Sequence, residues 1–273
     1  MDNPVCIGLN QITTITPSIC KIMGVKKPKK STNETIDELV NYCKNEIKSN
    51  ISKCLLYAPD AIAYYLTVKY PEQFEVVEQH APLGVKLCSI FPPKTPVCFA
   101  SMFSGALPEI HGIKLYEKPI LKCDTIFDAF IRANKKVAIV AVENSSIDLI
   151  FKERKMDYFT EKYDKEVTNR TIELLGTADY DLIVVYHQEY DDMVHATTPI
   201  SEKAIQAMNN HINSFEQMAI AFNKYWKDFN RIITFSPDHG SHISMETGKG
   251  THGNNNPEDM IIKHNFGIYK EIK

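Results

Sequence analysis

The strongest chemical signal in the sequence is the segment 235–240, FSPDHG. It places a carboxylate and an imidazole side by side, directly after an apolar run that is typical of a buried strand. In a regular strand Asp238 and His239 would point to opposite faces, so both can reach one metal ion only from a turn. We expect the conformational freedom of Gly240 to help form that turn. Taken alone, the motif is explained equally well by a capping Asp beside a surface His.

Two further segments add ligands of the same types. Asp191 and His195 are four residues apart and lie on one face if the segment is helical, which suits a divalent metal. His252 follows in a loop rich in Gly and Asn, where the backbone can approach a bound anion. Taken alone, Asp191 and His195 are also explained by an exposed helix start with a surface His. His252 alone is also explained by a solvated His in a loop. For His187 and His242 we expect a structural or supporting role.

Thr95 offers a hydroxyl nucleophile. It follows an apolar strand and a Pro-rich turn, and it precedes a short predicted helix that ends near Gly105. At the start of a helix, backbone N–H groups and the helix dipole favour anions such as phosphate. The alternative is that Thr95 only caps the helix. Ser101 and Ser104 are rival hydroxyls, but both lie later in the predicted helix.

The elements that must position these residues follow the pattern of an α/β fold, in which strand-length apolar runs alternate with amphipathic segments of helical length. Most of the apolar runs lack polar alternation, which is typical of strands buried on both faces. Strands are predicted at 52–57, 86–90, 137–142, 181–186 and 231–235. Helices are predicted at 35–48, 60–67, 124–134, 163–175 and 201–224.

Three candidate carboxylates each follow a predicted strand, namely Asp60, Asp191 and Asp238. Open α/β sheets bind ligands at the carboxyl ends of their strands. We therefore expect these carboxylates to meet at one edge of the sheet.

The 273 residues are expected to form one domain, with 44% hydrophobic and 24% charged residues, as in ordinary globular proteins. The N-terminal ~50 residues are expected to cover a sheet edge rather than line a substrate pocket. A net charge of −3 gives no basic field for long nucleic acid. The basic run at 26–30 is interpreted as a solvated loop.

No apolar stretch approaches the roughly 20 residues that span a bilayer, so no membrane partner is expected. The N-terminus lacks the layout of a secretion signal. The seven cysteines include no CxxC pair, and their odd number and irregular spacing favour reduced thiols. These features together predict a cytoplasmic protein.

Together and in this order, the four segments resemble the alkaline phosphatase superfamily, and more narrowly its nucleotide pyrophosphatase/phosphodiesterase-like branch. The resemblance covers most of the chain from about Leu55. The segment 57–62, YAPDAI, is similar to the first metal-binding Asp of the family, and 91–95, FPPKT, is similar to its nucleophile turn. The most specific match is 102–113, MFSGALPEIHGI, where Gly, Pro and His-Gly-Ile follow one another as in that branch.

The resemblance implies an alkaline phosphatase-like fold, with a mostly parallel central sheet and helices on both faces. It also implies two divalent metal ions, usually Zn²⁺, although Mn²⁺ would accept the same ligands. One ion would be held by Asp191, His195 and His252. The other would be held by Asp60, Asp238, His239 and the oxygen of Thr95. The three carboxylates and a Thr95 alkoxide would balance the charge of both ions.

The implied activity is hydrolysis of a small phosphate ester or nucleotide, of the phosphodiesterase or pyrophosphatase type, through a phosphothreonine at Thr95. Lys94 is an expected electrostatic helper. Many relatives carry a phosphate-contacting Asn after His-Gly-Ile, whereas 114–119 here reads KLYEKP, where Tyr116 is the expected donor. The gap between His239 and His252 is also shorter than in larger relatives.

These departures keep other functions open. A phosphomonoesterase or phosphonate hydrolase of the same superfamily is one alternative. A catalytically silent metal- or nucleotide-binding protein is another, although no ligand position is missing. The oligomeric state is not indicated by the sequence.

Overall fold

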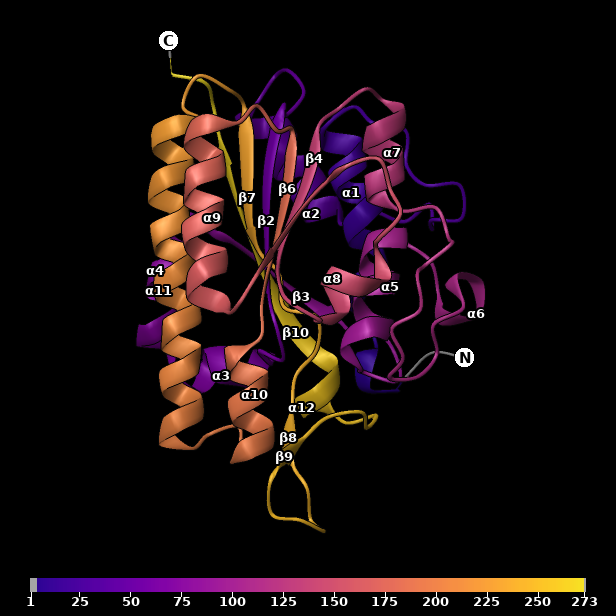
Figure 1. The fold of residues 1–273 in the computed structure, drawn as a ribbon, viewed down its shortest axis with the longest axis vertical. Helices are drawn as coiled ribbons and strands as arrows, with labels where there is room; N and C mark the ends of the chain where they lie inside the picture. Colours follow the sequence, from indigo (N-terminus) through magenta and orange to yellow (C-terminus); the bar gives the residue numbers. More distant parts are fainter. Residues whose placement is uncertain (1–3, 273) are drawn as a thin grey trace.

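The computed structural model describes residues 4–272, in which the apolar runs form the strands of an eight-stranded sheet with helices on both faces (Figure 1). The strands of this sheet are β1 (Asn10–Gln11), β2 (Lys53–Pro59), β3 (Leu83–Cys88), β4 (Val137–Val142), β5 (Asp157–Glu161), β6 (Leu182–His187), β7 (Arg231–Phe235) and β10 (Ile261–Tyr269). A separate short hairpin pairs β8 (His242–Ile243) with β9 (Gly250–Thr251).

The helical elements alternate with the strands along the chain. The α-helices are α1 (Ile15–Ile22), α2 (Asp37–Glu46), α3 (Tyr64–Lys69), α4 (Pro71–His80), α5 (Thr95–Ser104), α6 (Pro108–His111), α7 (Ile126–Arg132), α8 (Ser146–Ile150), α9 (Asp164–Thr177), α10 (Glu189–Ala196), α11 (Glu202–Tyr225) and α12 (Pro257–Met260). Two short 3-10 helices, η1 (Pro4–Cys6) and η2 (Ile12–Thr14), lie near the N-terminus.

The strand order is β1-β3-β10-β7-β2-β6-β4-β5, and only β10 runs antiparallel to its neighbours. The predicted mostly parallel sheet is therefore confirmed. β4 and β7 have the predicted bounds. The strand β10 was not predicted, because Lys263, His264 and Asn265 interrupt its apolar pattern. In the structure these three side chains bond to Glu78, to the Pro237 carbonyl and to the Ala81 carbonyl.

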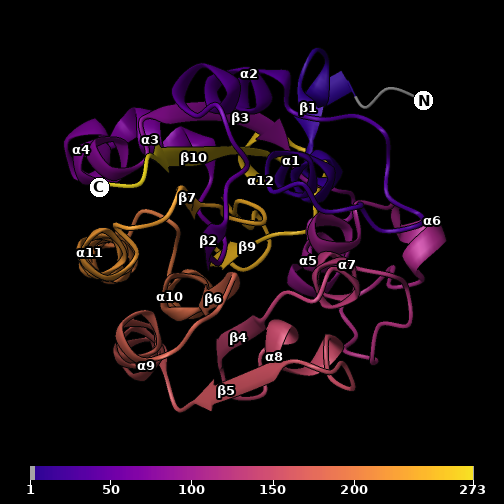
Figure 2. The ribbon, with the colours of Figure 1, turned by 90° about the horizontal axis from the view of Figure 1, so that it is seen from above.

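Helices cover both faces of the sheet because the central strands bury both faces. In β2, Cys54 and Leu56 belong to a core shared with α1, α2, α5, α7 and α8, whereas Leu55 and Tyr57 belong to a core shared with α3, α4, α9, α10 and α11. Figure 2 shows these two groups of helices on either side of the strands. Period-two alternation in a strand without polar positions produces such a two-sided core.

The predicted helix at 60–67 is wrong at its start. β2 continues to Pro59, Asp60 lies in a turn, and α3 begins only at Tyr64. Ala61 has a φ of 62°, in the left-handed region that a non-glycine residue adopts only at a cost. The Ala61 N–H donates to Asp238 Oδ1, which helps to hold this turn.

The N-terminal segment lies along the β3 edge of the sheet. β1 pairs in parallel with β3, with Asn10 opposite Leu87. Farther along, the Thr16 hydroxyl donates to the Met102 carbonyl on α5 over 2.6 Å. β1 thus pairs with the last two residues of β3 only, and the covering role expected for the N-terminal ~50 residues stays a prediction.

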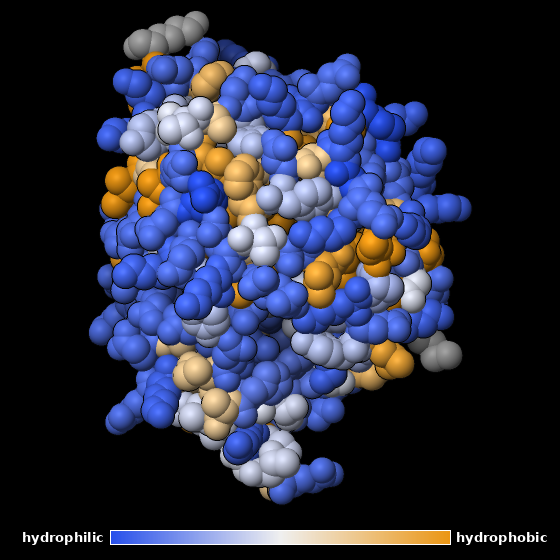
Figure 3. Space-filling model, viewed as in Figure 1, coloured by the Kyte–Doolittle hydropathy of each residue, from blue (hydrophilic) through white to orange (hydrophobic). Residues whose placement is uncertain are grey.

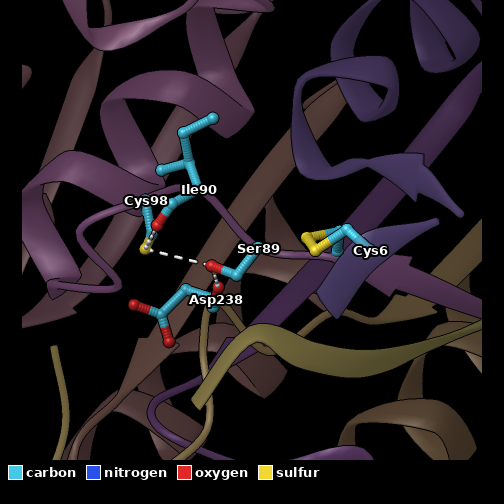
Figure 4. The surroundings of a disulfide bond; sticks show 6 residues. Cys6, Ser89, Ile90, Cys98 and Asp238 are labelled. Atoms are coloured by element: carbon cyan, nitrogen blue, oxygen red, sulfur yellow. Dashed lines mark hydrogen bonds between the residues drawn. A yellow bond between two sulfur atoms is a disulfide. The ribbon is translucent and has the colours of Figure 1, made fainter. Parts of the chain in front are cut away.

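The expectation of reduced cysteines is wrong for Cys6 and Cys88, which form a disulfide between η1 and the end of β3. Beside it, Ser89 Oγ donates to the Asp238 carbonyl over 2.6 Å and contacts the thiol of Cys98 (Figure 4). Structural disulfides are typical of oxidising compartments, so this bond removes the support that the cysteine pattern gave to a cytoplasmic location. That location stays a prediction.

The surface shows no extended apolar area on the face drawn in Figure 3, which is mainly hydrophilic with small, separate apolar groups. Within residues 4–272, none of the helices combines the length and the apolar character that crossing a bilayer requires.

Candidate metal centre

Six side chains gather where β2, β6 and β7 end, in two neighbouring clusters. The inner cluster consists of Asp60, Asp238 and His239, and the outer cluster consists of Asp191, His195 and His252. Within each cluster the potential ligand atoms all lie within 4.8 Å of one another. The clustering follows from the topology, because parallel strands bring their carboxyl ends, and the residues that follow them, to one edge.

The inner cluster is built from the ends of two adjacent strands. Asp60 follows β2, and Asp238 and His239 follow β7, which pairs with β2 in parallel. His239 Nε2 lies 3.4 Å from Asp60 Oδ1 and 3.4 Å from Asp238 Oδ2. All three residues are at most 1% exposed. The predicted turn after β7 therefore aims both neighbouring side chains at one point.

Gly240 has a different role from the predicted one. Its φ is not in the positive region, so the turn does not depend on its conformational freedom. Instead, a Cβ at this position would lie 2.0 Å from the Glu258 carbonyl oxygen and 2.5 Å from Ala63 Cβ. Glycine is needed here because two backbone segments approach closely behind His239.

The outer cluster joins a helix to a loop. Asp191 and His195 lie one turn apart on α10, with 3.4 Å between Oδ2 and Nε2. His252 Nε2 lies 3.2 Å from His195 Nε2 and 3.7 Å from Asp191 Oδ1. The His252 ring stacks on the His239 ring, with centroids 4.0 Å apart. The two clusters are therefore contiguous.

The buried histidines present the ring nitrogen that a metal would need. His239 Nδ1 lies 3.0 Å from the Gly240 carbonyl, and His252 Nδ1 lies 2.7 Å from the Pro93 carbonyl. A carbonyl only accepts, so each Nδ1 carries the proton and donates. Each Nε2 is then left with a lone pair directed into its cluster, which is the usual arrangement of a metal-binding histidine.

The carboxylates provide the test of whether a metal fits. Asp60 Oδ1, Asp238 Oδ2 and Asp191 Oδ1 are buried and have no hydrogen-bond partner. Burial raises the pKa of Asp60 and of Asp238, and the nearby charges of Asp238 and Asp191 raise that of Asp60 further. Buried carboxylate oxygens without partners are costly, and divalent cations would remove that cost. The Asp and His donors fit Zn²⁺ or Mn²⁺.

Thr95 is the first residue of α5 and lies beside the inner cluster. Its Oγ1 is 3.4 Å from Asp60 Oδ2 and 3.3 Å from His239 Nε2. The interpretation of Thr95 as a mere helix cap is wrong, because Lys94 occupies the cap position. The rival hydroxyls are engaged elsewhere, Ser101 with His111 and Ser104 with the Ala100 carbonyl.

Lys94 and Tyr116, the two residues predicted to contact the substrate, have different surroundings. The Lys94 ammonium group donates to the His252 carbonyl, so it supports the loop that holds the outer cluster. Tyr116 is 61% exposed. Partial burial of its ring and the charges of Asp60 and Asp191 raise the pKa of its phenol. Their contacts with substrate stay predictions.

Tyr186 was not identified from the sequence. It lies on β6, is 3% exposed, and its hydroxyl donates to Asp60 Oδ2. In the sequence it is one more apolar-type residue of a buried strand. The only indication of a functional role was its position next to the carboxyl end of that strand, from which the side chain can reach the candidate ligands.

Comparison with known proteins finds similarity to solved structures only. No protein-family model matches this chain, and no curated protein does. A murine ectonucleotide pyrophosphatase/phosphodiesterase 5, in an inactive form in complex with AMP, is similar with a TM-score of 0.56 and 19% identity over 71% of this chain and 59% of that chain. The human protein of the same name is similar with a TM-score of 0.56 and 19% identity over 71% of this chain and 58% of that chain.

A bacterial enzyme shows the same fold. Phosphonoacetate hydrolase from Sinorhizobium meliloti, in complex with phosphonoformate, is similar with a TM-score of 0.51 and 14% identity over 69% of this chain and 56% of that chain. The chain therefore spans less than two thirds of the length of each of these structures. At these identities the likeness is one of fold. The chain has the alkaline phosphatase-like fold that the resemblance in its sequence predicted.

Proposed function

We propose that this protein is a metal-dependent hydrolase of phosphoric esters, with Thr95 as nucleophile and divalent metal ions at the inner and outer clusters. The observation that carries the proposal is that Asp60, Asp191 and Asp238, beside a threonine hydroxyl, each have one buried oxygen without a hydrogen-bond partner. A purely structural role for these groups would leave their desolvation uncompensated.

The residues have distinct parts in the proposed reaction. When bound, the metal ions would neutralise charge and polarise the phosphoryl oxygens. Thr95 Oγ1 attacks phosphorus, the bond to one ester oxygen breaks and its alcohol leaves, and the phosphoryl group, with any remaining ester group, stays bonded to Thr95. Water then cleaves the bond between phosphorus and Thr95. Each displacement inverts configuration, so the overall reaction retains it.

The proposed substrate is a small phosphodiester or nucleotide. One structurally similar protein is described in complex with AMP, which supports a nucleotide. Phosphonate hydrolysis is the second candidate, because phosphonoacetate hydrolase shares the fold and because the six residues after His-Gly-Ile, 114–119, contain no Asn. Tyr116 is proposed to donate a hydrogen bond to the substrate in place of that Asn. Lys94 is proposed to add positive charge beside the substrate.

The test is turnover by metal-stripped protein after addition of Zn²⁺ or Mn²⁺. The substrates are bis-p-nitrophenyl phosphate, p-nitrophenyl phosphate and phosphonoacetate, which separate diester, monoester and phosphonate activity. We expect metal-dependent turnover of the diester. Thr95→Ala should abolish it while retaining the metal, whereas Thr177→Ala, on the exposed end of α9, should leave turnover unchanged. Bound metal without turnover of any substrate would favour a silent binding protein.

A further inference from the structure

A third Asp-His cluster in the described part of the chain lies outside the two candidate metal clusters. It consists of Asp164, His187 and His211. Asp164 is the first residue of α9, His187 is the last residue of β6, and His211 lies on α11. The side chains are 6%, 0% and 0% exposed. The function proposed above uses none of these three residues.

The contacts of the third cluster differ from those of the metal clusters. His211 Nε2 lies 2.9 Å from Asp164 Oδ2, which is a hydrogen-bond distance, and both oxygens of Asp164 accept backbone N–H groups. His187 contacts Tyr57 and Thr168 through its two nitrogens. In the inner and outer clusters, by contrast, one buried oxygen of each carboxylate lacks a hydrogen-bond partner, whereas in the third cluster the unpaired atom is His211 Nδ1. The third cluster is therefore a hydrogen-bond network rather than a ligand set.

The backbone groups that Asp164 accepts belong to the start of α10. Oδ1 accepts from the Gln188 N–H at 3.0 Å, and Oδ2 accepts from the Glu189 N–H at 2.9 Å. Gln188 is the N-cap residue of α10, but its side chain makes no capping hydrogen bond. A Ser or Asp at that position would accept from the second or third N–H of the helix. Here Asp164, 24 positions before Gln188, accepts the two N–H groups just before those, and the Tyr190 N–H lies 3.4 Å from His211 Nε2.

α10 depends on such support because it has only eight residues, about two turns. Isolated helices of that length are marginal in water. The same helix carries Asp191 and His195, two of the three residues of the outer cluster. A shift of its first turn would move Asp191 directly.

We propose that Asp164, held by His211, is a positioning residue that fixes the first turn of α10 and thereby sets the metal affinity of the outer cluster. The proposal rests on the function proposed above only in that the outer cluster binds a metal. The carboxylate suits this role because it stays ionised. Burial opposes ionisation, but His187, His211 and the Gln188 N–H outweigh it and keep the pKa of Asp164 well below its usual range.

The experiment compares Asp164→Asn and Asp164→Ala with the wild type by Zn²⁺ titration of the metal-stripped protein and by hydrogen exchange. We expect the weaker of two Zn²⁺ sites to lose about 10- to 100-fold in affinity in Asp164→Ala and less in Asp164→Asn, which keeps one acceptor. The tighter site should be unchanged. Amides 188–196 should exchange faster in both variants, whereas those of β7 should not.

Asp148→Asn is the matched control, since Asp148 is also a buried carboxylate that accepts a backbone N–H, from Asn144, but it lies on α8. It should leave both Zn²⁺ affinities unchanged. Equal affinity of the weaker site in wild type and Asp164→Ala would overturn this proposal alone. Three Zn²⁺ ions per chain, with one lost in the Asp164 variants, would overturn it in favour of a third metal site. A wild type without Zn²⁺ binding would overturn both proposals.

Discussion

The inner and outer clusters contain the same kinds of ligand, but different structures hold them. The inner residues follow two paired strands and are at most 1% exposed, so the register of β2 and β7 fixes them. The outer residues lie on a short helix and a loop, and the His195 side chain is 45% exposed. Strand ends in a sheet are less free to move than a two-turn helix. For the proposed metal ions, we therefore expect tighter binding at the inner cluster and faster exchange at the outer one.

The loop that carries His252 is stabilised, like α10, by a buried carboxylate that accepts two consecutive backbone N–H groups. Asp259 Oδ2 accepts from the Gly253 and Asn254 N–H groups, directly after His252, and its Oδ1 lies 2.7 Å from His242 Nδ1. The supporting role expected for His242 agrees with this contact. A buried carboxylate that accepts two consecutive N–H groups thus stabilises each segment of the outer cluster, one at α10 and one at the loop.

The largest expected effect is that of Asp238→Asn in the inner cluster. The substitution removes a charged ligand that no neighbouring group can replace, because the site is closed by sheet and backbone. We expect turnover to fall by on the order of 10³-fold, equivalent to about 4 kcal/mol, without recovery in excess Zn²⁺. The measurement is kcat/KM with metal content from the same sample. Full recovery in excess Zn²⁺ would contradict the ranking of the clusters.

An intermediate effect is expected for His195→Ala in the outer cluster. It removes a half-exposed ligand, and water can take the vacated position. Zn²⁺ affinity at the weaker site should fall by about 10- to 100-fold, with most of the turnover restored at high Zn²⁺. Zn²⁺ titration of activity checks this. A loss of Zn²⁺ affinity at the tighter site instead would contradict the assignment of the weaker site to the outer cluster.

The smallest of the three effects is expected for Tyr186→Phe. The change leaves the ring in its core and removes only the hydroxyl that donates to Asp60 Oδ2. We expect about a tenfold loss of turnover, confined to the inner cluster, because such supporting groups orient a ligand without replacing it. Tyr180→Phe, which removes a hydroxyl bonded to Asp157, is the control and should have no effect on turnover. An equal loss in both variants would indicate a general effect on stability.

The sequence predicted the parts of the fold whose cause is local. Aliphatic runs produced β4 and β7 at the predicted bounds, because such runs are buried on both faces. The four-residue spacing placed Asp191 and His195 on one helix face. The features that sequence reasoning missed depend on distant partners. Examples are β10, whose polar residues bond to other elements, and the Cys6–Cys88 pair, which joins residues 82 positions apart.

By itself, the sequence therefore determined the types of ligand, the nucleophile candidate and the strands that carry them. Only the tertiary structure decided which groups meet and what supports them. His195 and His252 are 57 residues apart, and they approach to 3.2 Å because helix, loop and sheet pack together. The contact of Asp164 with the start of α10 could not be predicted from the sequence either. The acceptor of a backbone N–H can come from any element that packs nearby.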